Sequence, residues 1–152
     1  MSIWNAEIGI DDLNAQGGDA LNETLGIEIT EITPHSVKGR MPVDHRTIQP
    51  AGVLHGGASV AFAETLASWA GHLAIDRTRF HAVGQEINAN HVRPASAGTW
   101  VYGEATAANI GRRSHVWDIR ITNEAGKLVC VSRCTLAIID VPSQYAESGQ
   151  RG

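Results

Sequence analysis

The chain of 152 residues and 16.2 kDa has the size of one domain whose core is large enough to fold unaided. Its composition of 43% hydrophobic and 18% charged residues is typical of a globular protein and excludes a disordered or fibrous chain. A formal net charge of -4 argues against binding nucleic acid through its phosphates. With only 2 Phe, 4 Trp and 2 Tyr, an aromatic platform for single strands is excluded as well.

The N-terminal residues and the cysteines indicate in which cellular compartment the protein is expected. Residues 1–7 have neither a basic stretch nor an apolar core, so we expect no secretory signal, and no run approaches the roughly 18 apolar residues that cross a bilayer. Cys130 and Cys134 lie in a predicted strand about 13 Å apart, roughly twice the reach of a disulfide. We therefore expect two small core thiols, no membrane association and a cytoplasmic protein.

The first half of the chain predicts short elements and then one long helix. Residues 10–16 are expected to form a helix capped by Asp11 or Asp12, and residues 26–43 two alternating strands joined by a turn. After a polar loop, residues 53–76 are rich in Ala and Leu, contain no Pro, and are apolar on nearly every side for about five turns. A helix with this composition is expected to be buried.

The second half predicts three or four long strands between residues 81 and 140. Alternate residues from 115 to 121 and from 128 to 138 would form the buried faces of the last two. Two strands, a buried helix and strands joined by short turns predict an α+β fold, in which a curved antiparallel sheet wraps around one long central helix. We expect residues 1–142 to form this single domain and residues 143–152 a flexible tail.

Glu64 lies in the middle of the apolar helix and needs an explanation. An ionised carboxylate buried without partners costs several kcal/mol. Glu64 could lie on a solvated stripe with Ser68 and His72, but the apolar flanks leave only a narrow polar strip. On a central helix, such a strip more often borders a cleft or an oligomer interface. We therefore favour a functional carboxylate over a solvated one.

The predicted helix begins at His55-Gly56-Gly57, where free N–H groups and the helix dipole favour an anion or a developing oxyanion. Glycines kept only for tight packing are the alternative. Gly56 lies about 12 Å along the helix from Glu64. A general base and an oxyanion donor must each come within roughly 3 Å of one carbonyl or its attacking water. If both act, two antiparallel copies of the helix must meet across a two-fold axis.

Two stretches resemble a known family. MPVDHRTIQPAGVLHGGAS (residues 41–59), then Glu64, then VGQEINANHVRP (residues 83–94) resemble the hotdog-fold acyl-CoA thioesterases. The similarity is to the branch that hydrolyses 1,4-dihydroxy-2-naphthoyl-CoA and includes the proofreading thioesterase of enterobactin synthesis. The 4-hydroxybenzoyl-CoA thioesterases share the spacing but differ around residues 86–90.

The resemblance implies a hotdog fold and thioester hydrolysis. Subunits would pair edge to edge, as a dimer of dimers (a homotetramer) with sites shared between subunits. The implied substrate is an aromatic acyl-CoA or acylated carrier protein. Coenzyme A would be part of the substrate, so neither a cofactor nor a metal is expected.

The resemblance also implies roles for individual residues. Glu64 would be the catalytic carboxylate, as nucleophile or general base, and the Gly56 N–H would bind the thioester oxygen. Gln49 and His55 would polarise or position the carbonyl, and Ser68 would hold the carboxylate or the water. The positions implied for substrate and CoA are Val83, Gly84, His91, Arg93, Arg112, Arg113, Ser114 and His115. The arginine pair suits phosphate, but a solvated hairpin turn explains it equally well.

Three other functions are alternatives to thioester hydrolysis. A hotdog dehydratase of 3-hydroxyacyl thioesters pairs a His with a carboxylate, but its His usually precedes a Phe-Pro segment that is absent around His55. A non-catalytic acyl-CoA-binding regulator would need a DNA-binding segment, and no basic helix-turn-helix is found. A metal hydrolase would draw on the 7 His, yet no His-x-x-x-His or Cys-x-x-Cys spacing occurs. Thioester hydrolysis is the expected activity, with dehydration and acyl-CoA binding as alternatives.

Overall fold

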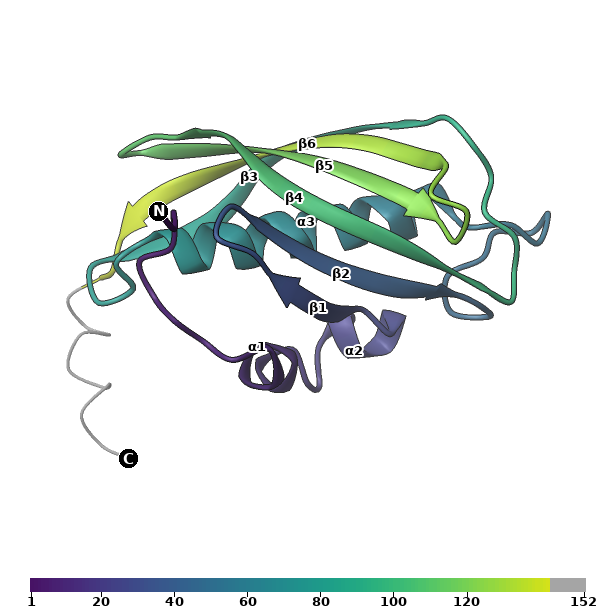
Figure 1. The fold of residues 1–152 in the computed structure, drawn as a ribbon, viewed down its shortest axis with the longest axis horizontal. Helices are drawn as coiled ribbons and strands as arrows, with labels where there is room; N and C mark the ends of the chain where they lie inside the picture. Colours follow the sequence, from purple (N-terminus) through teal and green to yellow (C-terminus); the bar gives the residue numbers. More distant parts are fainter. Residues whose placement is uncertain (143–152) are drawn as a thin grey trace.

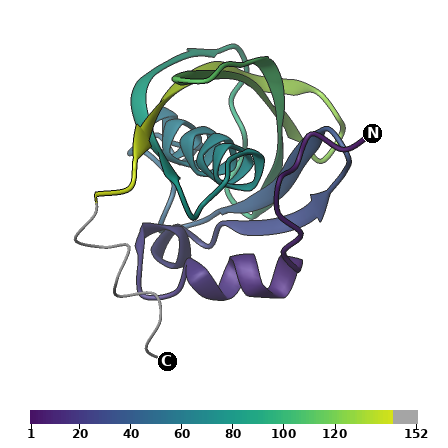
Figure 2. The ribbon, with the colours of Figure 1, turned by 90° about the vertical axis from the view of Figure 1, so that its left-hand side faces the viewer.

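The computed structural model describes residues 1–142, which contain one curved antiparallel sheet wrapped around a long helix (Figures 1 and 2). The expected tail at 143–152 lies outside the described residues. The elements are α1 (Ile10–Gln16), α2 (Leu21–Leu25), β1 (Glu28–Ile32), β2 (Ser36–Val43), α3 (Gly56–Ala74), β3 (Phe80–His91), β4 (Thr99–Ile110), β5 (Ser114–Asn123) and β6 (Leu128–Asp140). The 6 strands follow the order β1-β2-β4-β5-β6-β3, and all neighbours are antiparallel. The predicted α+β arrangement is confirmed.

The alternation of apolar residues places β5 and β6 as predicted. In β5, Trp117, Ile119 and Ile121 are buried and point to the same side of the sheet, because successive side chains of a strand point to opposite faces. In β6, Cys130 and Cys134 lie on the corresponding buried face, and both are free thiols, as expected. These faces form the core against α3.

The central helix packs closely on the sheet because two glycines face it. Gly39 of β2 pairs with Gly103 of β4. A Cβ atom at Gly103 would lie 2.6 Å from a methyl group of Leu66, and one at Gly39 would lie 2.9 Å from the other. Both positions therefore need glycine, and Phe62 and Leu66 of α3 are completely buried as a result.

The N-terminal segment covers the helix from the side away from the sheet (Figure 2). α1 has the predicted bounds, but the predicted cap is wrong. Gly9 occupies the N-cap position without a side-chain hydrogen bond, and Asp11 and Asp12 lie in the first turn. The side chain of Asn14 holds α1 on β1 through two hydrogen bonds with the backbone of Ile29. No helix within residues 1–142 is long and apolar enough to span a membrane.

β3 is an outer strand of the sheet and is 12 residues long. Among residues 1–142, only β6 pairs with it, so within this part of the chain its other edge presents unpaired backbone groups. A register shift between Gly84 and Glu86 marks a β-bulge in this strand. Both features matter for the site, because β3 runs alongside α3.

Candidate active site

The narrow polar strip of α3 opens into a groove rather than into bulk water. Glu64, Ser68 and His72 lie one turn apart along the helix, and all three are half-buried. They line a groove of about 430 Å³, whose other walls come from α2, α3 and β3. The wall residues are Leu21, Asn22, Ala61, Thr65, Trp69 and Ala82. The helical spacing predicts the strip, but the sequence does not indicate these walls.

Gly84 provides the space that the carboxylate of Glu64 occupies. A Cβ atom at Gly84 would fall 2.4 Å from Oε1 of Glu64, closer than real side-chain contacts. Gly84 precedes the bulge in β3. The carboxylate is thus seated against the backbone of β3, and any larger residue at 84 would displace it.

The thiol that lies closest to this chemistry is not a nucleophile. Burial, and then the carboxylates of Glu64 and Glu86, raise the pKa of Cys134 to about 12. Cys134 is completely buried and stays protonated at neutral pH. Glu64 is therefore the reactive group that this part of the groove offers.

The first turn of α3 forms a second centre. Nδ1 of His55 accepts a hydrogen bond of 2.7 Å from the Gly57 N–H and caps the helix. The Ala58 and Ser59 N–H groups bond to the His55 carbonyl. The Gly56 N–H donates to no group among the described residues. It is therefore available to an oxyanion, with the positive end of the helix dipole behind it.

Gly56 opens into a cavity of about 350 Å³ that is separate from the groove of Glu64. Gln49, His91 and Arg93 also line it. A Cβ atom at Gly56 would lie 2.8 Å from Nε2 of His91, so glycine allows this imidazole to approach the helix start. The structure thus brings Gly56, Gln49 and His91 together, and does not bring Glu64 to them within one chain.

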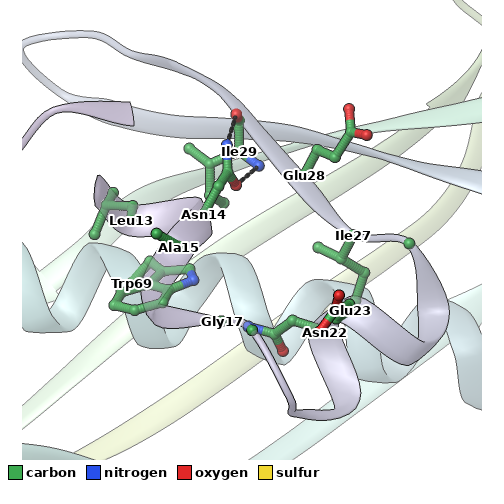
Figure 3. Close-up of a pocket in the computed structure, with 12 residues that line it drawn as sticks. Leu13, Asn14, Ala15, Gly17, Asn22, Glu23, Ile27, Glu28, Ile29 and Trp69 are labelled. Carbon is green, nitrogen blue, oxygen red and sulfur yellow. Dashed lines mark hydrogen bonds between the residues drawn. The ribbon is translucent and has the colours of Figure 1, made fainter. Parts of the chain in front are cut away.

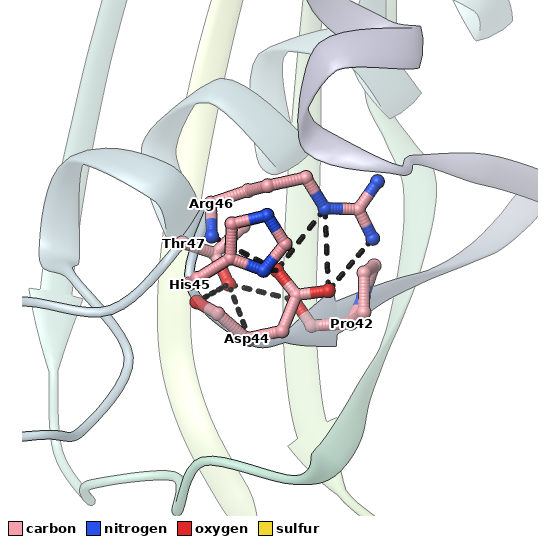
Figure 4. Close-up of polar contacts among 5 residues, drawn as sticks. All are labelled: Pro42, Asp44, His45, Arg46 and Thr47. Atoms are coloured by element: carbon pink, nitrogen blue, oxygen red, sulfur yellow. Dashed lines mark hydrogen bonds and ion pairs between the residues drawn. The ribbon is translucent and has the colours of Figure 1, made fainter.

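A tight turn of polar contacts follows β2 (Figure 4) and precedes Gln49 and His55 in the chain. The hydroxyl of Thr47 donates to the Pro42 carbonyl at 2.7 Å and accepts from the Asp44 N–H at 3.0 Å. The Thr47 carbonyl accepts from the His55 N–H at 2.8 Å, which ties the turn to the start of α3. The Arg46 guanidinium beside Asp44 lowers the pKa of that carboxyl to about 2. The sequence predicts only a polar loop here, without this turn.

The residues expected to bind CoA are divided between the two ends of the molecule. Arg93 lies at the end where His91 is found, and its guanidinium donates to the Leu128 carbonyl. Arg112 and Arg113 precede Ser114 at the start of β5, and Arg113 forms an exposed ion pair of 3.0 Å with Asp140. Figure 1 shows the turn between β4 and β5 at the opposite end from the start of α3.

His115 and Val83, two of the residues expected to bind the substrate or CoA, differ in solvent exposure. Val83 is 41% exposed on β3, where a ligand can reach it. His115 is only 2% exposed and packs edge-on against Trp117, with ring centroids 6.1 Å apart. A side chain buried this deeply does not face a bound nucleotide. The structure therefore does not support the expected contact between His115 and CoA.

A further cavity of about 530 Å³ adjoins the groove of Glu64 (Figure 3). It lies under α1 and α2, and Asn22 and Trp69 line both spaces. Thr65 donates to the side chain of Asn22 at 3.3 Å and so links α3 to α2. The N-terminal helices therefore border this second space beside the groove. Within residues 1–142, no group of three or more His, Cys, Asp or Glu side chains could hold a metal ion.

Comparison with known proteins identifies the family of this chain. Residues 51–130 match the family model of the thioesterase superfamily. The 1,4-dihydroxy-2-naphthoyl-CoA hydrolase of Escherichia coli is 44% identical over 90% of this chain and 99% of its own length. The proofreading thioesterase EntH of Cronobacter turicensis is 44% identical over 90% of this chain and 98% of its own length.

Solved structures of thioesterases share the fold. The crystal structure of a mutant of thioesterase PA1618 from Pseudomonas aeruginosa has a TM-score of 0.90 and 41% identity, and covers 92% of this chain and 100% of that chain. The crystal structure of thioesterase HI1161 from Haemophilus influenzae has a TM-score of 0.87 and 46% identity, and covers 91% of this chain and 95% of that chain. The predicted hotdog fold is confirmed.

Proposed function

Because this chain belongs to the thioesterase superfamily and is a thioester hydrolase, we propose that it cleaves aromatic acyl-CoA or acyl-carrier thioesters to the free acid and thiol. The observation that carries the proposal is a half-buried carboxylate, Glu64, in a groove whose walls include the apolar Leu21, Ala61 and Ala82 and one large aromatic side chain, Trp69. An aromatic acyl group suits such walls. The proposed reaction needs no cofactor, and the free thiols suit a cytoplasmic location.

We infer that the working site is shared between two copies of the chain. Glu64 is seated against Gly84, and Gly56 lies against His91, and both contacts fall on the outer strand β3. If the unpaired edges of two β3 strands join antiparallel, with the two-fold axis between residues 87 and 88, Gly84 of one copy lies opposite His91 of the other. This register brings the Glu64 groove of one copy to the Gly56 N–H of the second.

The same pairing supports a shared surface for CoA. Arg113 bonds through its carbonyl to Ile138, which pairs with Ala82 near the start of β3. Arg93 follows the other end of β3, roughly 30 Å away in one chain at the rise of an extended strand. Antiparallel pairing of two copies places the start of one β3 beside the end of the other. We therefore assign phosphate binding to Arg112 and Arg113 of one copy together with Arg93 of the second.

In this site the thioester oxygen accepts the Gly56 N–H, which stabilises the negative charge of the tetrahedral intermediate. Gln49 and His55 border the same carbonyl. Along one route the Glu64 carboxylate attacks the carbonyl carbon, the C–S bond breaks, and water hydrolyses the resulting anhydride. Along the other, Glu64 takes a proton from water, the hydroxide adds to the carbonyl, and the thiolate leaves and is protonated. Ser68, one turn away, holds the carboxylate or the water.

Replacement of the carboxylate tests the proposal. Glu64→Gln keeps the size of the side chain, so we expect an unchanged fold and a loss of kcat of at least about 100-fold, the usual contribution of a general base. The assay measures thiol release from an aromatic acyl-CoA, with circular dichroism to confirm folding. A variant with near-normal turnover would remove Glu64 from the chemistry. In heavy-oxygen water, a single turnover that labels Glu64 indicates an anhydride that water opens at the glutamyl carbon. Label in the product alone is expected both for the base route and for an anhydride that water opens at its acyl carbon.

A further inference from the structure

α2 is attached only weakly to the helix beside it. None of its five residues is buried. Within residues 1–142, the only hydrogen bond that joins α2 to another helix or strand links the side chains of Asn22 and Thr65 at 3.3 Å. The Thr65 hydroxyl also donates to the Ala61 carbonyl at 2.7 Å. Because a hydroxyl has one proton, the bond to Asn22 is the weaker of the two.

The hydrogen bonds that stabilise α2 lie instead within its own segment. The Asp19 N–H donates to the Glu23 carboxylate at 2.6 Å, before the first turn. The Ile27 N–H donates to the Asn22 carbonyl at 2.8 Å, after the last turn. Both bonds begin and end within residues 19–27, so a rotation of α2 about the ends of this segment preserves them.

The segment that contains α2 has glycines at both ends and a fixed base. Gly17 and Gly18 precede it, and Gly26 follows it with φ 70°, a conformation that glycine adopts at little cost. Beyond these glycines, the two hydrogen bonds between Asn14 and Ile29 fasten α1 to β1. The chain therefore leaves and returns at one bonded pair of elements, which is the construction of a hinged loop.

The structure leaves room for this segment to move inward (Figure 3). The cavity of about 530 Å³ is lined by Gly17, Gly18 and Gly26 on one side and by Trp69 of α3 on the other. Leu21, at the start of α2, borders the adjoining groove of Glu64 and is 59% exposed. An inward movement of α2 would bury this leucine against whatever occupies the groove.

We propose that residues 18–26, the lid, close over the groove of Glu64 when an acyl group enters it, and that Leu21 then moves from solvent onto the acyl group. This inference rests on the proposed function, since thioester hydrolysis at Glu64 brings an acyl group to this groove. Free coenzyme A lacks the acyl group that Leu21 would cover, so it does not close the lid. Closure holds the acyl group in place and excludes bulk water from it.

Hydrogen exchange followed by mass spectrometry tests the movement. The probe is phenacyl-CoA, in which a methylene between carbonyl and sulfur prevents hydrolysis. Bound phenacyl-CoA should slow the exchange of amides in residues 20–27 at least about fivefold, and coenzyme A alone should not. Residues 10–16 of α1 are the internal control and should not change. In free Thr65→Val, which lacks the bond to Asn22, the amides of residues 20–27 should exchange about fivefold faster.

The affinity of Leu21→Ala provides a second measurement. Phenacyl-CoA should bind this variant about fivefold more weakly than the wild type, whereas coenzyme A should bind both equally. Thr24→Ala is the matched control, because Thr24 is exposed on the same helix and lines neither the groove nor the cavity. Its affinity for phenacyl-CoA should equal that of the wild type.

Three results would contradict the lid and leave the proposed function intact, provided that the wild type hydrolyses benzoyl-CoA. They are unchanged exchange of residues 20–27 with phenacyl-CoA bound, equal slowing by coenzyme A alone, and an unchanged affinity of Leu21→Ala for phenacyl-CoA. If the wild type neither hydrolyses benzoyl-CoA nor binds phenacyl-CoA, the proposed function fails, and the lid falls with it.

Discussion

At Gly84 the absence of a side chain has a direct consequence for Glu64. The carboxylate occupies the space that a Cβ atom at this position would take, with the two points only 2.4 Å apart. This oxygen, Oε1 of Glu64, belongs to the carboxylate that we assign to thioester hydrolysis. A methyl group at 84 would therefore move the carboxylate without removing its charge.

Gly84→Ala should lower kcat by about tenfold or more and leave KM nearly unchanged, since a displacement of about 1 Å is enough to impair a positioned group. In Glu64→Asp, the carboxylate is one methylene shorter and no longer reaches the added methyl group. The cost of Gly84→Ala should then be smaller in that background, as steady-state kinetics of the double-mutant cycle would show. Gly9→Ala, at the N-cap of α1, where an added Cβ atom meets nothing closer than 3.4 Å, is the control. Equal costs in the two backgrounds would mean that Gly84 does not act through Glu64.

His115 is a buried histidine outside the site. It is 2% exposed, and Nδ1 has no hydrogen-bond partner. Burial lowers the pKa of His115 from 6.5. In the unfolded chain the side chain keeps its ordinary pKa, so the unfolded state binds a proton first as pH falls. The contribution of His115 to stability is complete above about pH 6.5 and is lost as pH decreases below it.

His115→Phe should therefore reduce the acid sensitivity of folding. Urea denaturation near pH 7.5 and near pH 5 gives the free energy of unfolding at each pH, and the variant should lose less of it than the wild type between the two. The aromatic contact with Trp117 is preserved by phenylalanine. His72, whose pKa burial also lowers, contributes the remaining sensitivity in the same direction. An identical loss in the variant would show that His115 is not desolvated in the folded chain.

The turn before α3 is the element that holds Gln49 and His55 in place. Thr47 is 1% exposed, and its hydroxyl joins the Pro42 carbonyl to the Asp44 N–H. Thr47→Val keeps the shape and removes both bonds, which should cost about 1–3 kcal/mol of unfolding free energy in urea titrations and lower kcat as well. Asp44→Asn breaks only the exposed pair with Arg46 and should cost about 1 kcal/mol or less. A larger loss of unfolding free energy in Asp44→Asn than in Thr47→Val would show that the ion pair of Asp44 with Arg46, and not the Thr47 hydroxyl, stabilises the turn.

The elements show where local sequence patterns determine structure. The alternation in β5 and β6 identifies strands directly, because both strands have one buried face. α3 begins at Gly56 with His55 as its cap, as the His55-Gly56-Gly57 motif predicts, whereas Val53 and Leu54, at the start of the apolar segment, form β-bridges with Ser96 and Ile48. α2 was not predicted, because five residues give no helical period and Ala20 provides no side-chain cap.

For the whole molecule, the sequence could supply the residues of the site but not their environment. The helical spacing of Glu64, Ser68 and His72 follows from the chain alone. The contact of Glu64 with Gly84 depends on a bulge in a strand that follows the helix, and no local pattern indicates it. For His115 the local pattern is the better guide. The alternation in β5 places it on the buried face with Trp117, as the structure does, whereas the family resemblance places it at CoA.

The molecule presents two incomplete centres joined by one exposed strand. Glu64 and Gly56 open into separate cavities, and β3 borders both. An unpaired outer strand of 12 residues is a surface that proteins normally cover. A second copy on this strand would cover it and complete both centres at once.

A mixture of two inactive variants tests this claim most directly. Glu64→Gln lacks the carboxylate. Gly56→Pro lacks the N–H, and its ring also displaces the His91 imidazole, so both effects of this change fall on the centre at the start of α3. Proline is tolerated at the first position of a helix, and His55, with φ −70° and ψ 130°, already has the backbone that a residue before proline adopts. When the two chains are co-expressed, a mixed dimer contains one site with both lesions and one with neither. Random pairing should then restore about a quarter of wild-type hydrolysis. Activity no greater than that of the separate variants would show that Glu64 and Gly56 do not act across two copies.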